Sequence, residues 1–114
     1  MTQIRKTYQE VNPELLYSEV KDFVLKQGVN LDETRLETYT LPDESASFIS
    51  RGTLIFKVRD EAGGKECMRA HIVGLVRGET KMMLDIDEAL FPKSSIQSLQ
   101  DDLDFIFANY EVKS

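Results

Sequence analysis

The sequence has few of the residues that indicate a disulfide-rich, secreted or membrane-spanning protein. Its 114 residues include one cysteine, Cys67, which cannot form a disulfide within the chain and is typical of a reducing compartment. Residues 1–14 carry charges at Arg5 and Glu10 and contain no apolar run, so we expect neither a secretory signal nor a transmembrane span. We therefore expect a cytoplasmic protein that folds without disulfides and has no contact with a membrane.

Motifs that would identify an enzyme or a cofactor-binding protein are missing as well. Cys67 and His71 stand four residues apart, which on a strand is about 13 Å, too far to share one metal ion. The acidic run 85–88 places only two carboxylates on one strand face, which makes a weak cation site. His71 beside Asp85 lacks both a nucleophile and an oxyanion site. We therefore expect no metal and no cofactor, and an enzyme is only a third alternative.

Overall composition is that of one ordinary globular domain. Apolar residues make up 41% of the chain and charged residues 30%, and 114 residues suffice to bury one core. We expect a single domain over residues 1–114, with residues 1–11 as a flexible N-terminal segment. The net charge of −6 argues against general nucleic-acid binding, which favours a basic domain.

Positive charge is nevertheless concentrated in the middle of this acidic chain. Residues 51–81 carry seven basic and four acidic residues, a net charge of +3, whereas residues 1–50 carry −4 and residues 82–114 carry −5. This distribution predicts a local basic surface flanked by acidic segments.

Two segments have helical periodicity. Asn12, Pro13 and Glu14 form a helix start, and Gly28 supplies a stop, so we expect a helix over residues 13–27. The run Ser94–Gln97 matches a capping box and predicts the start of a final helix. The apolar stripe of that helix consists of Ile96, Leu99, Leu103, Ile106, Phe107 and Tyr110. Phe105 lies about 180° from Ile96, among acidic residues, and we expect it to contact a partner or to be exposed.

The rest of the chain has strand character. Residues 33–41 predict a strand whose facing is ambiguous. From Phe48 onward the even positions of three strands are apolar or small and should be buried. Parity gives a provisional register with Gly52 opposite Gly74, Val73 opposite Met83 and Arg69 opposite Asp87. The expected fold is α+β with the order α-β-β-β-β-α, a four-stranded antiparallel sheet with both helices packed on its even face.

The odd face of this sheet mixes basic and aliphatic side chains. Apolar residues inside a cationic rim are typical of a protein-binding surface, although a solvated outer face is the alternative. The expected function is a small protein-binding module, adaptor-like or chaperone-like and non-catalytic, whose partner is another protein or a second copy. The predicted partner-binding residues are Ile49, Arg51, Val73, Leu75, Arg77, Lys81, Met83 and, on the last helix, Phe105.

A different function follows from the two glycines of the buried face. If Gly52 and Gly74 oppose each other, two side chains are missing there, and either a bulky neighbour fills the notch or a small apolar cavity opens. The alternative function is therefore a small-molecule-binding domain with a cavity between sheet and helices.

Two short pieces near the C-terminus, Ala89–Pro92 and Asp104–Tyr110, resemble segments of SecB-type export chaperones. That family is also acidic and also places helices after a four-stranded antiparallel sheet. The resemblance covers about a tenth of the chain, and the N-terminal helix departs from the layout of the family. It implies a client- or partner-binding role and assigns no binding residue.

Overall fold

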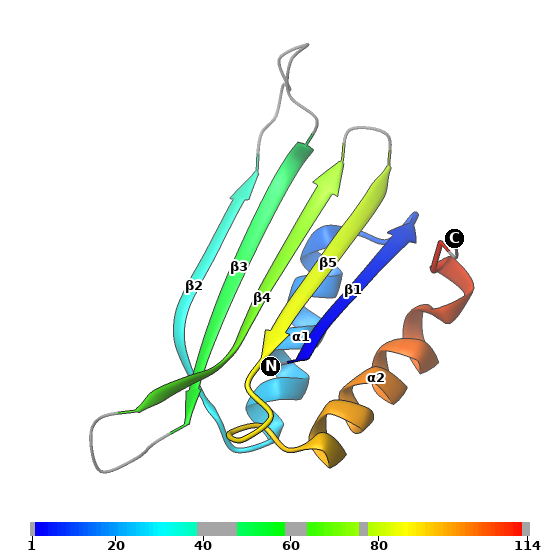
Figure 1. The fold of residues 1–114 in the computed structure, drawn as a ribbon. Coiled ribbons are helices and arrows are strands. Elements are labelled where there is room, and N and C mark those ends of the chain that lie inside the picture. Colours follow the sequence, from blue (N-terminus) through cyan, green and yellow to red (C-terminus); the bar gives the residue numbers. More distant parts are fainter. Residues whose placement is uncertain (1, 39–47, 59–63, 76–77, 113–114) are drawn as a thin grey trace.

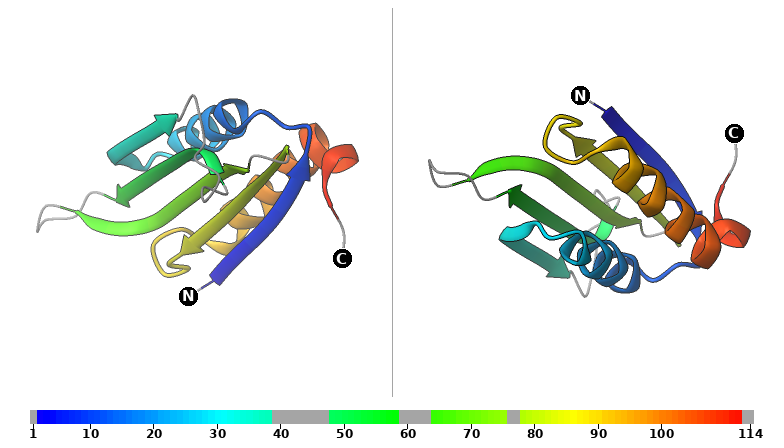
Figure 2. Two further views of the ribbon diagram at one scale, coloured as in Figure 1. Left: turned by 90° about the horizontal axis from the view of Figure 1, so that it is seen from above. Right: turned by 90° about the horizontal axis from the view of Figure 1, so that it is seen from below.

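The protein is an α+β domain built on one antiparallel sheet. The computed structural model describes residues 2–38, 48–58, 64–75 and 78–112, with the backbone alone for residues 36–38, 48 and 49. In chain order its elements are β1 (Thr2–Gln9), α1 (Pro13–Lys26), β2 (Asn30–Thr38), β3 (Phe48–Val58), β4 (Lys65–Leu75), β5 (Glu79–Ile86), α2 (Lys93–Phe107) and the short 3₁₀ helix η1 (Ala108–Tyr110). The strand order is β1-β5-β4-β3-β2, and both helices lie on one face of the sheet (Figures 1 and 2). Neither helix within the described ranges is long and apolar enough to cross a membrane.

The sheet has five strands, so the prediction of four strands in the order α-β-β-β-β-α is wrong. Residues 1–11 were expected to be flexible, yet Thr2–Gln9 form β1 and pair along their whole length with β5. Ile4 and Tyr8 are buried against the helices, whereas Lys6 lies between them on the same face. A charged residue at that position breaks the apolar alternation that identifies a strand.

Helix α1 begins and ends close to where the sequence predicts. The Asn12 side-chain oxygen accepts hydrogen bonds from the backbone amides of Glu14 at 2.7 Å and Leu15 at 3.4 Å, and Pro13 occupies the first helical position. Gly28 has a φ of 89°, the left-handed conformation that glycine tolerates best after a helix. The buried face of α1 consists of Leu16, Tyr17, Val20 and Val24.

Helix α2 has the predicted apolar stripe but not the predicted cap. It begins at Lys93, directly after Pro92, and no side chain caps it, so the capping box expected over Ser94–Gln97 does not form. Gln97 donates instead to the carboxylate of Asp101, 2.9 Å away. The stripe is buried at Ile96, Leu99, Leu103 and Phe107, whereas Ile106 and Tyr110 at its margin are exposed.

The even positions of β3, β4 and β5 face the helices, as predicted. The buried core includes Leu54, Phe56, Met68, Ala70, Ile72, Met82, Leu84 and Ile86. The predicted register is nevertheless wrong by two residues on each side of β4. Gly52 lies opposite Ile72 and Val73 opposite Lys81. A shift of two residues keeps every side chain on its face, so parity alone cannot detect it.

Strand β2 begins at Asn30, three residues before the predicted start, and residues 39–41 of the prediction lie outside the described residues. The pairing with β3 shifts between Leu31 and Glu33, which marks a β-bulge at Asp32. A bulge adds one residue and interrupts the alternation of faces. The bulge precedes the predicted strand, in which Glu33, Thr34 and Arg35 are all exposed, so no apolar alternation there indicated which face is buried.

Candidate functional site

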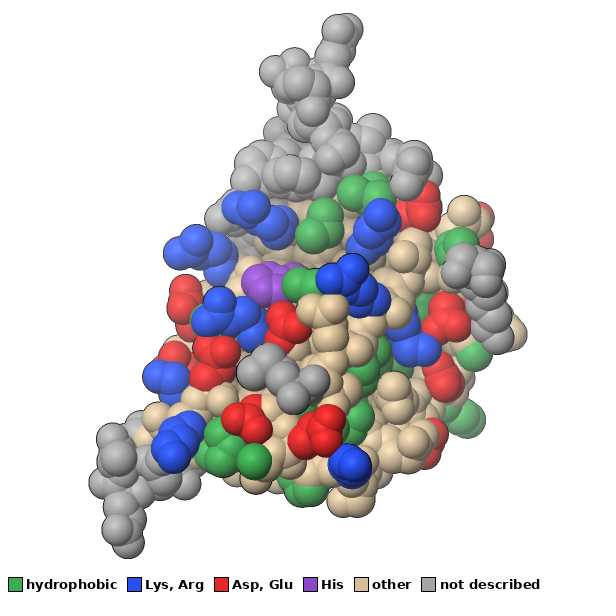
Figure 3. Space-filling view, in the orientation of Figure 1, with side chains coloured by type: hydrophobic (Ala, Val, Ile, Leu, Met, Phe, Trp, Pro, Cys, Tyr) green, Lys and Arg blue, Asp and Glu red, His purple; other side chains and the backbone are tan. Residues whose placement is uncertain are grey.

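The open face of the sheet, the face that the helices do not cover, aligns side chains from four strands in rows. One row runs from Arg51 through Val73 and Lys81 to Thr7. The next row consists of Thr53, His71, Met83 and Arg5. Figure 3 looks onto this face and shows the single histidine of the chain near the middle, with lysine and arginine side chains around it.

A shallow depression of about 430 Å³ lies where these two rows meet. Its lining includes the predicted residues Val73, Lys81 and Met83, together with Arg5, Thr7 and His71. The sequence prediction missed Arg5 and Thr7 as members of this surface because it missed β1. The structure therefore brings three of the seven predicted sheet residues together in the depression and adds an edge strand to them.

The aliphatic side chains of this face are half-buried. Val73, Leu75 and Met83 are all partly covered, and Ile55, one row beyond His71, is buried. Arginine and lysine neighbours can cover apolar surface with their methylene chains while their charged ends stay in water. The open face thus presents cationic groups around a partly covered apolar centre.

Carboxylates also lie on the open face on both sides of these two rows. Asp85, Glu33 and Glu66 lie beyond the row of His71, Glu79 lies two residues from Lys81 on β5, and none of the four is free of partners. Asp85 accepts from the Gln3 amide at 2.8 Å, and Glu66 pairs with Arg69 at 2.8 Å. Arg69 lies opposite Asp85, so the expected cross-strand pair of Arg69 with Asp87 is not formed. Within the part of the chain that the structure describes, Lys81 has no ion pair.

The other four predicted sheet residues do not line the depression or are not fully described. Arg51 is exposed beside Val73, and Leu75 ends β4 opposite Phe48. The side chain of Ile49 and the whole of Arg77 lie outside the described residues.

Phe105 lies in the helix layer and cannot join the depression. It is 90% exposed and stands two residues from each of the buried Leu103 and Phe107. At 100° per residue it therefore projects about 160° away from them, on the side of α2 turned away from the sheet. Asp101 precedes it by one turn, so the most exposed aromatic ring of the described residues stands beside carboxylates.

Other exposed apolar side chains also lie outside the open face. The six large hydrophobic residues that are exposed among the described residues are Leu15, Leu25, Phe105, Ile106, Tyr110 and Val112. All belong to α1, α2, η1 or the segment that follows η1. The helix layer, not the open face, therefore has the more accessible apolar surface.

Between the helices, two carboxyl groups interact. Burial, followed by a hydrogen bond and Coulomb repulsion from Asp102 on α2, raises the pKa of Glu19 on α1. Leu15 and Ile106 each lie one helical turn from this contact, and the helices run antiparallel (Figure 1). Leu15 and Ile106 therefore lie on the same side of the acidic pair, toward the start of α1 and the end of α2.

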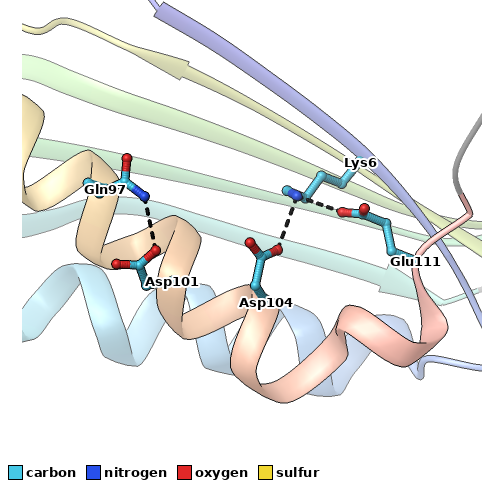
Figure 4. Close-up of polar contacts among 5 residues, drawn as sticks. All are labelled: Lys6, Gln97, Asp101, Asp104 and Glu111. Carbon is cyan, nitrogen blue, oxygen red and sulfur yellow. Dashed lines mark hydrogen bonds and ion pairs between the residues drawn. The ribbon is translucent and has the colours of Figure 1, made fainter.

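Lys6 joins β1 to the helix layer. Its amino group lies 2.6 Å from Glu111 and 3.3 Å from Asp104, as Figure 4 shows. Burial lowers the pKa of Lys6, but the hydrogen bonds to Glu111 and Asp104 outweigh it and raise the pKa above its usual value. The amide of Val112 also donates to the Thr7 carbonyl at 2.7 Å. These contacts link β1 to the C-terminal end of the helix layer.

The expected neighbour of His71 is different in the structure. Met83, not Asp85, lies opposite it. The Cys67 thiol is buried and donates to the Phe56 carbonyl at 3.5 Å, and burial raises its pKa, which disfavours the reactive thiolate. Among the described residues there is no group of three or more His, Cys, Asp or Glu side chains that could hold a metal ion.

Pro13 occupies the space beside Gly74. A Cβ atom added at Gly74 would lie 2.4 Å from the Pro13 Cγ and 2.8 Å from the Ser50 Oγ. Gly52 does not oppose Gly74, because Ser50 does. The missing side chain therefore makes room for the first turn of α1, and the geometry does not favour a ligand cavity at this position.

The chain matches no known protein-family model, and no curated protein matches its sequence. The geometry of the open face and of the helix layer is therefore the basis for a functional proposal.

Proposed function

We propose that this protein is a small, non-catalytic protein-binding module, adaptor-like or chaperone-like, that binds its partner on the open face of the sheet. The observation that supports the proposal most directly is the depression lined by Val73, Met83 and His71, with Arg5 and Lys81 at its rim. Small apolar centres with charged rims are typical of transient protein interfaces.

The charges on this face define the chemistry of the partner. Lys81 is exposed and without an ion pair among the described residues, and Arg5 extends from the neighbouring strand. Cationic groups of this kind accelerate encounter with an acidic surface and disfavour a basic one. A partner that carries carboxylates around an apolar side chain would match both the apolar centre of the depression and the cationic side chains beside it.

A charge-reversing variant of the open face tests this proposal. Val73→Asp combined with Lys81→Glu should abolish partner binding without unfolding the chain, because Lys81 is exposed and Val73 is only half-buried. The tagged chain would serve as bait in the cells that produce it, and the recovered proteins would be compared by mass spectrometry.

Lys26→Glu provides a matched control, since it reverses one exposed charge at the end of α1, on the opposite side of the sheet. Proteins recovered by the wild type and by this control, but not by the double variant, support the proposal. Recovery of the same proteins by a folded double variant, with folding checked by circular dichroism, would rule out the open face.

A further inference from the structure

Phe105 and the depression on the open face carry opposite, complementary features. Phe105 is an almost fully exposed aromatic residue on a helix whose charged residues are Lys93, Asp101, Asp102 and Asp104, a net charge of −2. The depression is lined by the apolar Val73, Met82 and Met83, by Thr7 and His71, and by the cationic Arg5, Lys6 and Lys81. An aromatic side chain flanked by acids is the partner chemistry that this depression would select.

We infer that the partner of the open face is a second copy of this chain, which inserts Phe105 and presents Asp101 to the cationic rim. This inference rests on the proposal that the open face binds protein. Exposed aromatic rings are costly in water unless a partner covers them, and no described residue covers Phe105. The net negative charge of α2 and the cationic side chains of Arg5 and Lys81 at the depression make two copies mutually attractive.

The positions of the two surfaces determine the symmetry of the contact. Figure 2 shows that both helices lie on one side of the sheet. Phe105 projects from the outer side of α2, whereas the depression is lined by residues of the open face on the other side of the sheet. We call the Phe105 surface the donor and the depression the acceptor. A two-fold dimer uses the same surface on both copies, so it would not pair a donor and an acceptor that lie on opposite sides of the molecule. The contact is therefore head-to-tail, and each added copy leaves one free donor and one free acceptor.

Head-to-tail association predicts growth with concentration and weakening with salt. The wild type should exceed the monomer mass of 13.1 kDa in light scattering at low salt, increasingly so at higher concentration. Because the rim charges are exposed, added salt should screen them and shift the mass back toward the monomer. A monomer at every concentration and at low salt would overturn the inference.

Single variants on the two surfaces separate donor from acceptor. Phe105→Ser should weaken association at least about tenfold through loss of the central aromatic contact, and Lys81→Glu should weaken it by repulsion from Asp101. Leu25→Ser, at an exposed apolar residue near the end of α1, is the matched control for the first variant and should associate normally. Normal association of either Phe105→Ser or Lys81→Glu would contradict the inference.

A mixture of the two variants gives the decisive result. Phe105→Ser keeps an intact depression and Lys81→Glu keeps an intact Phe105, so an equimolar mixture should form one-to-one pairs that grow no further. Their mass would be twice 13.1 kDa. If the mixture stays monomeric while the wild type associates, the contact is not head-to-tail.

Failure of this inference is distinguishable from failure of the proposed function. Phe105→Ser leaves the open face unchanged, so it should still recover any other protein that binds there. If this variant and the wild type recover one protein that Lys81→Glu loses, and the wild type is monomeric, the open face binds a different partner. The proposed function would then stand without self-association.

Discussion

Apolar side chains are exposed to different extents on the two sides of the sheet. On the open face, Val73, Leu75 and Met83 are half-buried among long cationic side chains. On the helix layer, Phe105 is 90% exposed and Leu15 is 56% exposed. A pleated strand packs each side chain against neighbours in its row, whereas a narrow helical stripe leaves residues outside it uncovered. Charge therefore distinguishes the open face, and exposed apolar surface distinguishes the helix layer.

The largest expected effect concerns how tightly the helix layer packs on the sheet. Gly74→Ala should destabilise the protein by about 3 kcal/mol, because the new methyl group meets Pro13 and Ser50 at distances far below van der Waals contact. Val73→Ala, next to it on the open face, should cost about 1 kcal/mol or less. Urea unfolding of both variants measures the difference. Equal destabilisation would mean that the two sides are equally well packed.

A smaller effect is expected where the helix layer is joined to β1. Lys6→Met should destabilise the protein by about 1 to 2 kcal/mol, because the Lys6 side chain is only 17% exposed and its loss leaves Glu111 and Asp104 without their cation. Native-state hydrogen exchange should show faster exchange of the Val112 amide, which bonds Thr7. Unchanged exchange at Val112 would show that Lys6 does not hold the C-terminal segment.

The smallest expected effect on stability concerns the acidic pair between the helices, Glu19 on α1 and Asp102 on α2. Because burial and the neighbouring Asp102 raise the pKa of Glu19 above its usual value, protonation of Glu19 stabilises the folded state. That contribution is complete below the unfolded pKa and is lost as the pH rises through the folded pKa. At pH 7, Glu19→Gln should therefore stabilise the protein by less than about 0.5 kcal/mol.

Thermal unfolding between pH 4 and pH 7 tests this pH dependence. As the pH rises across that range, the wild type should lose more stability than Glu19→Gln does. Asp102→Asn should reduce this pH-dependent loss as well, because it removes the other carboxylate of the pair. Parallel pH profiles for the wild type and Glu19→Gln would show that the two carboxyl groups do not interact.

The sequence predicts the faces of the sheet better than its pairing. The alternation that includes Leu54, Met68 and Leu84 identifies the buried face correctly. The face on which a residue lies follows from the pattern of its own strand and does not require knowledge of the neighbouring strand. The register depends on which residues the turns bring together, and residues 59–63 and 76–77 of these turns lie outside the described residues. The sequence could therefore indicate Val73 and Lys81 as surface residues without indicating that they are direct neighbours.

The omission of β1 had the larger consequence for the candidate site. Lys6 on the covered face is compatible with a strand only because Asp104 and Glu111 neutralise it, and both lie about 100 residues away in the sequence. No local pattern encodes that compensation. The exposure of Phe105, in contrast, follows from its angle on α2, which the sequence gives directly.

The position of β1 at one edge of the sheet and β2 at the other has a consequence for folding kinetics. Strands β2 to β5 follow one another in the chain and in the sheet, so each of them pairs with a neighbour in sequence. The nearest pair between β1 and β5, Gln9 with Glu79, is 70 positions apart, and closing so long a loop costs more conformational entropy than closing a hairpin. We therefore expect β1 to pair after strands β2 to β5 have paired with one another, and β5 to have an unpaired edge until β1 adds to it.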